Sequence, residues 1–287
     1  MLLPDFILPE LKNAVLESTG MDSVEFCKDR QYFEKFSLPV SYIYNSRGFR
    51  DLEWPTCLQQ STWCLGDSFT VGLGLPFELT WPQQVRTNLD VDTVSVAMDG
   101  ASNQWIARRA CQILEQIRPR HMIIMWSYFH RRELSNQTLT DMKRRLHYDA
   151  LDQLTIDYDN FENCVKSVTN ANKTTTIIHA MIPNCHDVVH ARSTWDQIKG
   201  ESWPEQLPAS LTNLPKFVQH EIAHVHGMFD KLEKLCQCAV RLESLKTTTQ
   251  FVDYDVVDWA RDGYHFGVKT SEMLGKKLCR IVSTGVP

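Results

Sequence analysis

Three residue types that together activate a nucleophile stand in two short segments far apart in this chain. Ser68 follows a Gly-Asp pair at the end of the apolar run 63–65, and Asp262 and His265 belong to a late Asp-Gly-Tyr-His segment. A serine hydroxyl is a poor nucleophile at neutral pH, so it needs a histidine to accept its proton and a carboxylate to hold that imidazole in the right tautomer. Asp262 and His265 can do both jobs, and the pattern therefore indicates nucleophilic catalysis by Ser68.

Regular elements next to these segments predict where the three side chains lie. The residues after Ser68 indicate a loop, with Gly72, Gly74 and Pro76, and the segment 78–89 then has a helical pattern. The Asp-Gly-Tyr-His segment likewise precedes a helical pattern near the end of the sequence. A serine on a turn after a strand lies at the carboxyl edge of a sheet, where open α/β folds bind their ligands.

The order of the short motifs, from about residue 45 onward, resembles that of a known family. The motifs are the Gly-Asp-Ser block that ends at Ser68, the pair Asp99-Gly100 after the apolar run 94–97, and the block from Asp262 to His265. In these blocks the chain resembles the SGNH hydrolases, also called GDSL esterases and lipases.

This resemblance implies a role for each matched residue. Ser68 is then the nucleophile, His265 the general base and afterwards the general acid, and Asp262 the residue that orients the imidazole. The oxyanion is held by the backbone N–H groups of Ser68 and Gly100, where glycine lets the substrate oxygen approach the main chain closely. The resemblance further implies ester hydrolysis through an acyl-enzyme, without a metal or organic cofactor, on substrates such as acetylated sugars, short-chain esters or lysolipids.

The segment 123–133 departs from the family pattern. Family members usually have Gly-x-Asn-Asp after the third strand of their sheet, whereas this segment contains no asparagine. Ser127, Tyr128 or Asn103 is then the third oxyanion donor, or the hole works with two backbone donors. Because the loss of one donor typically costs on the order of a hundredfold in rate, a catalytically silent relative that binds glycans or serves a structural role is the alternative hypothesis.

Five apolar, β-branched runs predict the strands of one sheet: 61–65, 93–97, 122–126, 175–182 and 251–257. They are short and nearly continuous, as expected for parallel strands that are covered on both faces. Helical stripes between them follow the three-four spacing of helices that pack on a sheet. The pattern predicts an α/β fold, a three-layer α/β/α sandwich with a central, mainly parallel five-stranded sheet, and the resemblance implies the flavodoxin-like arrangement of the SGNH hydrolases. Right-handed crossovers then bring Ser68, Gly100, residues 126–130 and His265 to one sheet edge.

Two regions lie outside this alternation of strands and helices. Residues 1–55 are interpreted as an N-terminal arm packed on the core, and residues 56–287 as the hydrolase domain. Within that domain, about 183–215 form a loop-rich insertion after a strand. Such an insertion suits either a lid or substrate wall, or a surface excursion anchored by its tryptophans.

A second motif suggests different chemistry. His220, Glu221 and His224 fit H-E-x-x-H, in which two histidines one helical turn apart bind zinc and the glutamate acts as base. The apolar stripe of the same predicted helix points another way, however, so a zinc-dependent hydrolase is only the second alternative and no metal is expected. The basic run that includes Arg131 and Arg132 is interpreted as a solvated face, or as a grip for an anionic substrate group.

Composition narrows the classes of function. The 287 residues are 43% hydrophobic, enough to bury a substantial core, and the net charge of -5 provides no general attraction to nucleic acid. Nine scattered cysteines, an odd number, favour reduced thiols. The sequence shows no signal-peptide pattern and no run of membrane-span length, so we expect a cytoplasmic protein whose partner is a small-molecule or carbohydrate ester. The residues do not determine an oligomeric state.

Overall fold

The structure is a computed structural model that describes residues 8–19, 22–27, 30–129, 131, 133, 150–182, 241, 244–246 and 248–284. The predicted insertion at 183–215 and the H-E-x-x-H motif at 220–224 lie outside these residues. Within the described ranges, no helix is long and apolar enough to cross a membrane. The described cysteines at 27, 57, 64, 111, 164 and 279 are free thiols.

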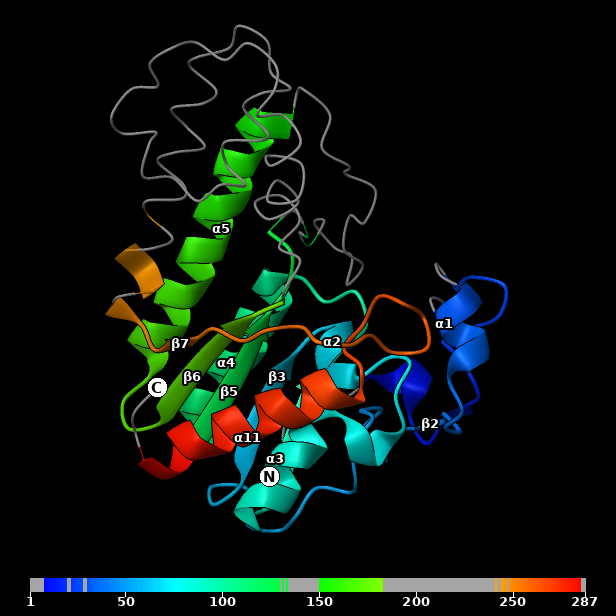
Figure 1. Ribbon diagram of the computed structural model, residues 1–287. Helices are drawn as coiled ribbons and strands as arrows, with labels where there is room; N and C mark the ends of the chain where they lie inside the picture. Colours follow the sequence, from blue (N-terminus) through cyan, green and yellow to red (C-terminus); the bar gives the residue numbers. More distant parts are fainter. Residues whose placement is uncertain are drawn as a thin grey trace, which may run out of the picture.

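A sheet of five strands, in which all neighbouring strands are parallel, lies at the centre of the fold (Figure 1). In spatial order the strands are β4 (Thr93–Ala97), β3 (Thr62–Gly66), β5 (His121–Trp126), β6 (Thr176–Met181) and β7 (Phe251–Val252). The predicted parallel five-stranded sheet is confirmed, and the first four strands agree with their apolar runs to within one residue at each end. The fifth is shorter than predicted, because Asp253 and Asp255 interrupt the run and acidic residues are disfavoured in strands.

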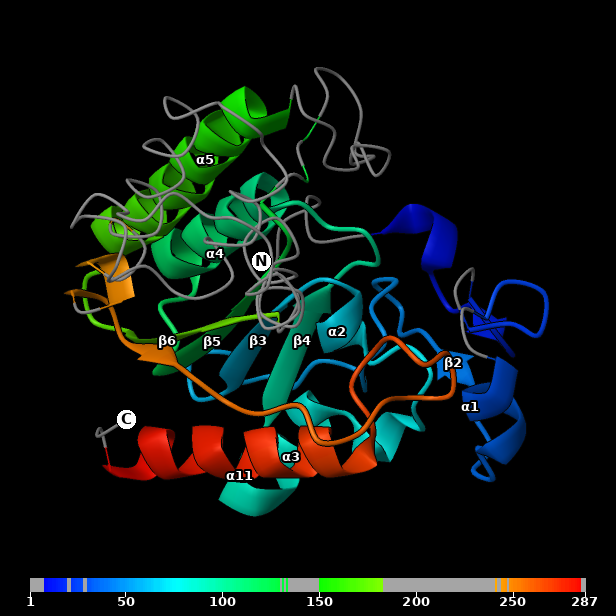
Figure 2. The same ribbon diagram turned by 45° about the horizontal axis from the view of Figure 1, so that its top comes forward.

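Helices cover both faces of the sheet, which explains why its strands are apolar on both sides, the edge strand β4 included. All residues of β3 and β4 are buried, as are all but the first of β5. Helices α4 (Asn103–Gln116) and α5 (Ala150–Ala171) pack together over one face, and α3 (Trp81–Leu89) and α11 (Val268–Thr284) over the other (Figure 2). The predicted three-layer α/β/α sandwich is confirmed.

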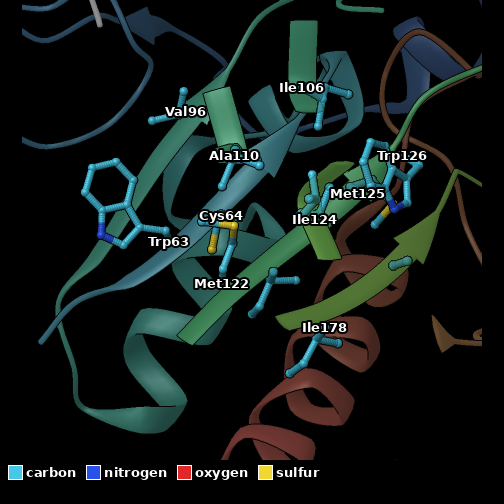
Figure 3. Close-up of a cluster of buried hydrophobic side chains, with 14 of the residues drawn as sticks. Trp63, Cys64, Val96, Ile106, Ala110, Met122, Ile124, Met125, Trp126 and Ile178 are labelled. Atoms are coloured by element: carbon cyan, nitrogen blue, oxygen red, sulfur yellow. The ribbon is translucent and has the colours of Figure 1, made fainter. Parts of the chain in front are cut away.

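The packing of α4 shows how the sequence builds these layers. The helix begins after Ser102, whose hydroxyl accepts the N–H of Trp105 at 3.1 Å and so caps the first turn. Ile106 and Ala110, four residues apart and both fully buried, then point toward the strands (Figure 3). The same capping residue ends the loop between β4 and α4, which contains the pair Asp99-Gly100.

The N-terminal segment contains a second, two-stranded sheet. β1 (Val15–Leu16) pairs antiparallel with β2 (Tyr42–Ile43). The short helix η1 (Pro9–Leu11) precedes β1, and the short helix α1 (Arg30–Lys35) precedes β2. Strands of two residues are too short to leave an alternating pattern, so the sequence analysis missed them. Tyr42 is buried in an apolar cluster with Val71, Leu73 and Ala97, and the segment therefore contacts the loop that follows Ser68.

Asp51 ties the end of this segment to β4 through a buried carboxylate. One oxygen accepts the N–H of Ser95 at 2.8 Å, and the other lies 3.3 Å from a guanidinium nitrogen of Arg86. Burial raises the pKa of Asp51 to about 6, although the N–H of Ser95 and the charge of Arg86 act in the opposite direction. The ordinary value is 3.8, so the folded state binds this proton more tightly than the unfolded chain does.

Raising the pH from 4 to 7 is therefore expected to remove about 2 kcal/mol of stability at Asp51, because deprotonation costs more in the folded state than in the unfolded chain. This stability is lost as the pH rises from the ordinary pKa of 3.8 to the folded-state pKa of about 6. Urea unfolding of the wild type and Asp51→Asn at both pH values measures it: relative to wild type, the variant should gain about 2 kcal/mol on going to pH 7. An effect of the substitution that is equal at both pH values would contradict this assignment.

Candidate active site

Ser68 begins α2 (Ser68–Val71), a single helical turn that follows β3 directly. Asp67 caps the turn, because one of its carboxylate oxygens accepts the N–H of Phe69 at 3.1 Å. The sharp exit from the strand requires glycine at position 66, where a Cβ would lie 2.0 Å from the Thr70 hydroxyl oxygen. Ser68 therefore stands at the carboxyl end of a central strand, and only 1% of it is exposed.

The predicted serine, histidine and aspartate meet in one chain of hydrogen bonds. Nε2 of His265 lies 2.8 Å from Oγ of Ser68, and Nδ1 of the same ring lies 2.5 Å from Oδ2 of Asp262. All three residues are at most 2% exposed. The structure thus brings together two sequence segments that are 197 positions apart, in the order hydroxyl, imidazole, carboxylate.

The surroundings of Asp262 fix the tautomer of His265. Its other oxygen, Oδ1, accepts the backbone N–H groups of Tyr264 and His265 at 2.9 Å and 3.0 Å. Burial alone would raise the pKa of Asp262, but the hydrogen bond from the His265 ring and these backbone N–H groups outweigh it, and the pKa lies below its ordinary value. An ionised Asp262 accepts the hydrogen on Nδ1 of His265, which leaves Nε2 as the acceptor that faces the Ser68 hydroxyl.

The loop that carries Asp262 and His265 is held at both ends. Trp259 and Phe266 form a β-bridge across it, and the N–H of Ala260 donates to the carbonyl of His265 at 2.8 Å. The ring of Phe69, next to the serine, lies 4.7 Å from the His265 ring and 4.8 Å from that of Phe266. The imidazole is therefore packed between its own loop and the helical turn that begins with Ser68.

Gly100, the second predicted oxyanion donor, follows the strand beside that of the serine. Gly66 pairs with Ala97 in the parallel register of β3 and β4, so the loops after both strands leave the same edge of the sheet. Gly100 adopts φ 72°, a left-handed conformation that favours glycine. Burial raises the pKa of the neighbouring Asp99 carboxylate, although His265, Arg131 and the backbone N–H of Gly100 act in the opposite direction.

Solved structures of several hydrolases are similar to this chain. One is a member of the lipolytic protein G-D-S-L family from Veillonella parvula DSM 2008, with 11% identity, a TM-score of 0.40, and coverage of 78% of this chain and 99% of that chain. The others are a lipase/acylhydrolase from Enterococcus faecalis (15% identity, TM-score 0.41, 78% and 96% covered) and the psychrotrophic esterase EstA from Pseudoalteromonas sp. (14%, 0.41, 79% and 98%). No family model and no curated protein sequence matches the chain. At such identities a similarity concerns the fold, and the roles of individual residues depend on the contacts in the site.

The side chains considered as a third oxyanion donor lie after β5 and at the start of α4. The amide nitrogen of Asn103 donates to the carbonyls of Ser127 and Tyr128 at 3.1 Å and 3.2 Å, and its oxygen accepts the N–H of Ser127 at 2.8 Å. The hydroxyl of Ser127 donates to Oδ2 of Asp67 at 2.6 Å. Asn103 and Ser127 therefore hold the loop in place, and their side-chain donors are engaged by protein oxygens.

Arg131 has a different position from the one that the sequence suggested. Instead of facing solvent, its side chain is only 8% exposed, and Nη1 lies 2.8 Å from Oδ2 of the fully buried Asp67 and 2.9 Å from Oγ of Ser127. Its guanidinium carbon lies 4.7 Å from the centre of the Tyr128 ring. The interpretation as a solvated face is therefore wrong for Arg131, and Arg132 lies outside the described residues. The buried aspartate of the Gly-Asp-Ser block was the available signal, because such a charge requires a partner.

Proposed function

We propose that this protein is a serine ester hydrolase that acts through an acyl-enzyme intermediate. The observation that carries the proposal is the buried chain of hydrogen bonds from Ser68 through His265 to Asp262. A histidine aligned in this way raises the nucleophilicity of a hydroxyl by accepting its proton as the new bond forms. The resemblance of the motif blocks to those of SGNH hydrolases points to the same chemistry.

The reaction follows from the positions of these groups. Nε2 of His265 accepts the proton of Ser68 as Oγ attacks the ester carbonyl, and the backbone N–H groups of Ser68 and Gly100 bind the resulting oxyanion. Collapse of this intermediate breaks the bond to the alcohol oxygen, which takes the proton from His265. A water molecule then attacks the acyl-serine in the same manner, so that the acid leaves and the proton returns to Ser68. No step requires a redox partner.

The substrate class that we propose is an acylated small molecule or an acylated carbohydrate. This proposal is supported by the resemblance to SGNH hydrolases, since that family includes enzymes for acetylated sugars, short-chain esters and lysolipids.

A catalytically silent protein with the same fold, which binds glycans or has a structural role, is the second candidate. It is favoured by the lack of an asparagine in the segment 123–133, where SGNH hydrolases usually carry a third oxyanion donor. The zinc-dependent alternative concerns His220 and His224, which lie outside the described residues. Within those residues, no cluster of three or more His, Cys, Asp or Glu side chains could hold a metal ion.

A fluorophosphonate probe tests these candidates directly, because it reacts covalently with activated serines and requires no knowledge of the substrate. We expect one label per chain, on the peptide that contains Ser68, and none on heat-denatured protein or on His265→Ala. Assay of bound zinc in the same sample covers the metal-dependent alternative. A folded wild-type protein that takes up no label and contains no zinc would support the silent protein instead, and stoichiometric zinc that is lost in His220→Ala would support the metalloenzyme.

A further inference from the structure

Arg261 immediately precedes Asp262. Its side chain extends from the loop that carries Asp262 and His265 into the N-terminal segment. Its Nε and Nη2 atoms lie 3.0 Å and 2.7 Å from Oδ2 of Asp22, and Nη2 also donates to the backbone carbonyl of Glu17 at 2.9 Å. The Asp22 side chain is fully buried and that of Arg261 is 13% exposed, so the ion pair is largely shielded from water. The loop that carries Asp262 and His265 is thereby bound to a residue 239 positions earlier in the sequence.

Tyr42 connects the same carboxylate to the loop that follows the nucleophile. Its hydroxyl donates to Oδ2 of Asp22 and accepts the backbone N–H of Gly74 at 2.7 Å. Burial, together with the charge of Asp22, raises the pKa of Tyr42, so the hydroxyl keeps its hydrogen and acts as a donor toward Asp22. The guanidinium carbon of Arg50 lies 4.2 Å from the centre of the tyrosine ring and holds it from the other side.

The two loops joined by Asp22 also touch each other. The N–H of Arg261 faces the carbonyl of Gly74 at 3.4 Å, a long hydrogen bond. A Cβ added at Gly74 would lie 2.7 Å from Cβ of Ala260, and Gly74 has φ 75°. The loop after Ser68 and the loop that carries His265 therefore meet without room for a larger side chain, next to the groups that Asp22 binds, which are Tyr42 and Arg261.

We propose that Asp22 is a positioning residue for the hydrolysis proposed above. Its carboxylate joins the loop of Ser68, through Tyr42, to the loop of His265, through Arg261, and so sets the distance between nucleophile and base. The inference rests on the proposed function, since the groups that it positions are the nucleophile and base of that reaction. A carboxylate suits this place because it accepts charge-assisted hydrogen bonds from the guanidinium and a further bond from the hydroxyl, which a neutral amide does more weakly.

Asp22→Asn is expected to lower the rate of fluorophosphonate labelling of Ser68 by about tenfold to a hundredfold, because misplacement of reacting groups by about 1 Å costs up to a hundredfold. With an ester substrate, the fall should appear in kcat and leave KM within about twofold, since Asp22 acts on the reacting groups through Tyr42 and Arg261. Glu25→Gln is the matched control: it removes an exposed carboxylate three residues away on the same segment, and its labelling rate should equal that of the wild type. A folded Asp22→Asn variant that is labelled at the wild-type rate would overturn the proposal.

Two further measurements keep the positioning role separate from folding and from the proposed activity. Arg261→Lys keeps the charge but loses the paired nitrogens that face Asp22, so it should show part of the same loss even if Asp22→Asn does not fold. Proton NMR of the hydrogen between Nδ1 of His265 and Asp262 requires no activity: its strongly downfield resonance should broaden or shift in Asp22→Asn and persist in Glu25→Gln. Absence of label on the wild type would refute the proposed function alone, whereas an unchanged resonance in Asp22→Asn would refute the positioning role.

Discussion

Replacement of Ser68 by alanine should abolish covalent labelling and lower kcat for ester hydrolysis by about 10⁴- to 10⁶-fold, with little change in KM. In the proposed mechanism the hydroxyl oxygen forms the acyl-enzyme, whereas the alanine methyl group leaves the proposed oxyanion donors in place. His265→Ala should cause a loss of similar size, because a serine without a base is a weak nucleophile. Steady-state kinetics on a chromogenic ester, together with labelling by the fluorophosphonate probe, measure both effects.

The double variant Ser68→Ala/His265→Ala provides the sharper control. Residues that act as one unit show strongly non-additive effects, so the double variant should be no slower than either single variant. Asp262→Asn, which keeps the shape but favours the wrong imidazole tautomer, should retain the fold and lose about four orders of magnitude in kcat. Multiplicative losses in the double variant, or a Ser68→Ala protein with near wild-type turnover, would show that these residues do not form a catalytic unit.

Arg131→Met should destabilise the protein by about 3–5 kcal/mol, because it leaves the carboxylate of Asp67 buried without its cation. The side chain of Asp67 is 0% exposed and that of Arg131 is 8% exposed, so water cannot replace the lost partner. Asp67 also caps the turn that begins with Ser68, and labelling of the serine should fall in the same variant. Urea unfolding followed by circular dichroism measures the loss of stability.

Arg108 offers a matched comparison within the same chain. Its guanidinium binds Glu133 through two nitrogens, but the Arg108 side chain is 46% exposed, so Arg108→Met should cost at most about 1 kcal/mol. The double variant Asp67→Asn/Arg131→Met should recover part of the stability lost in Arg131→Met, since the unpaired charge is gone. Equal losses at Arg108 and Arg131 would mean that burial does not decide the strength of the Asp67 pair.

Local sequence patterns were sufficient to predict the central five-stranded sheet. A strand covered on both faces must be apolar along its whole length, so the run at 93–97 identified β4 (Thr93–Ala97) directly. The limits of β7 (Phe251–Val252) were missed, because an apolar run records potential burial and not the point at which the backbone leaves its neighbour. β1 (Val15–Leu16) and β2 (Tyr42–Ile43) were missed for a related reason: two residues have no measurable period.

The candidate site, like the fold, was only partly predictable from the sequence. The sequence by itself determined the residue types for nucleophilic chemistry and their order along the chain, because turn glycines and the Gly-Asp-Ser and Asp-x-x-His motifs are local features. Only the tertiary structure decided that Ser68 and His265 lie within hydrogen-bonding distance, that Arg131 is buried against Asp67, and that Asp22 joins the two loops. These contacts depend on the path of the backbone between distant segments. From the sequence one can infer that a charged residue needs a partner if it is buried. Which partner it has depends on the fold.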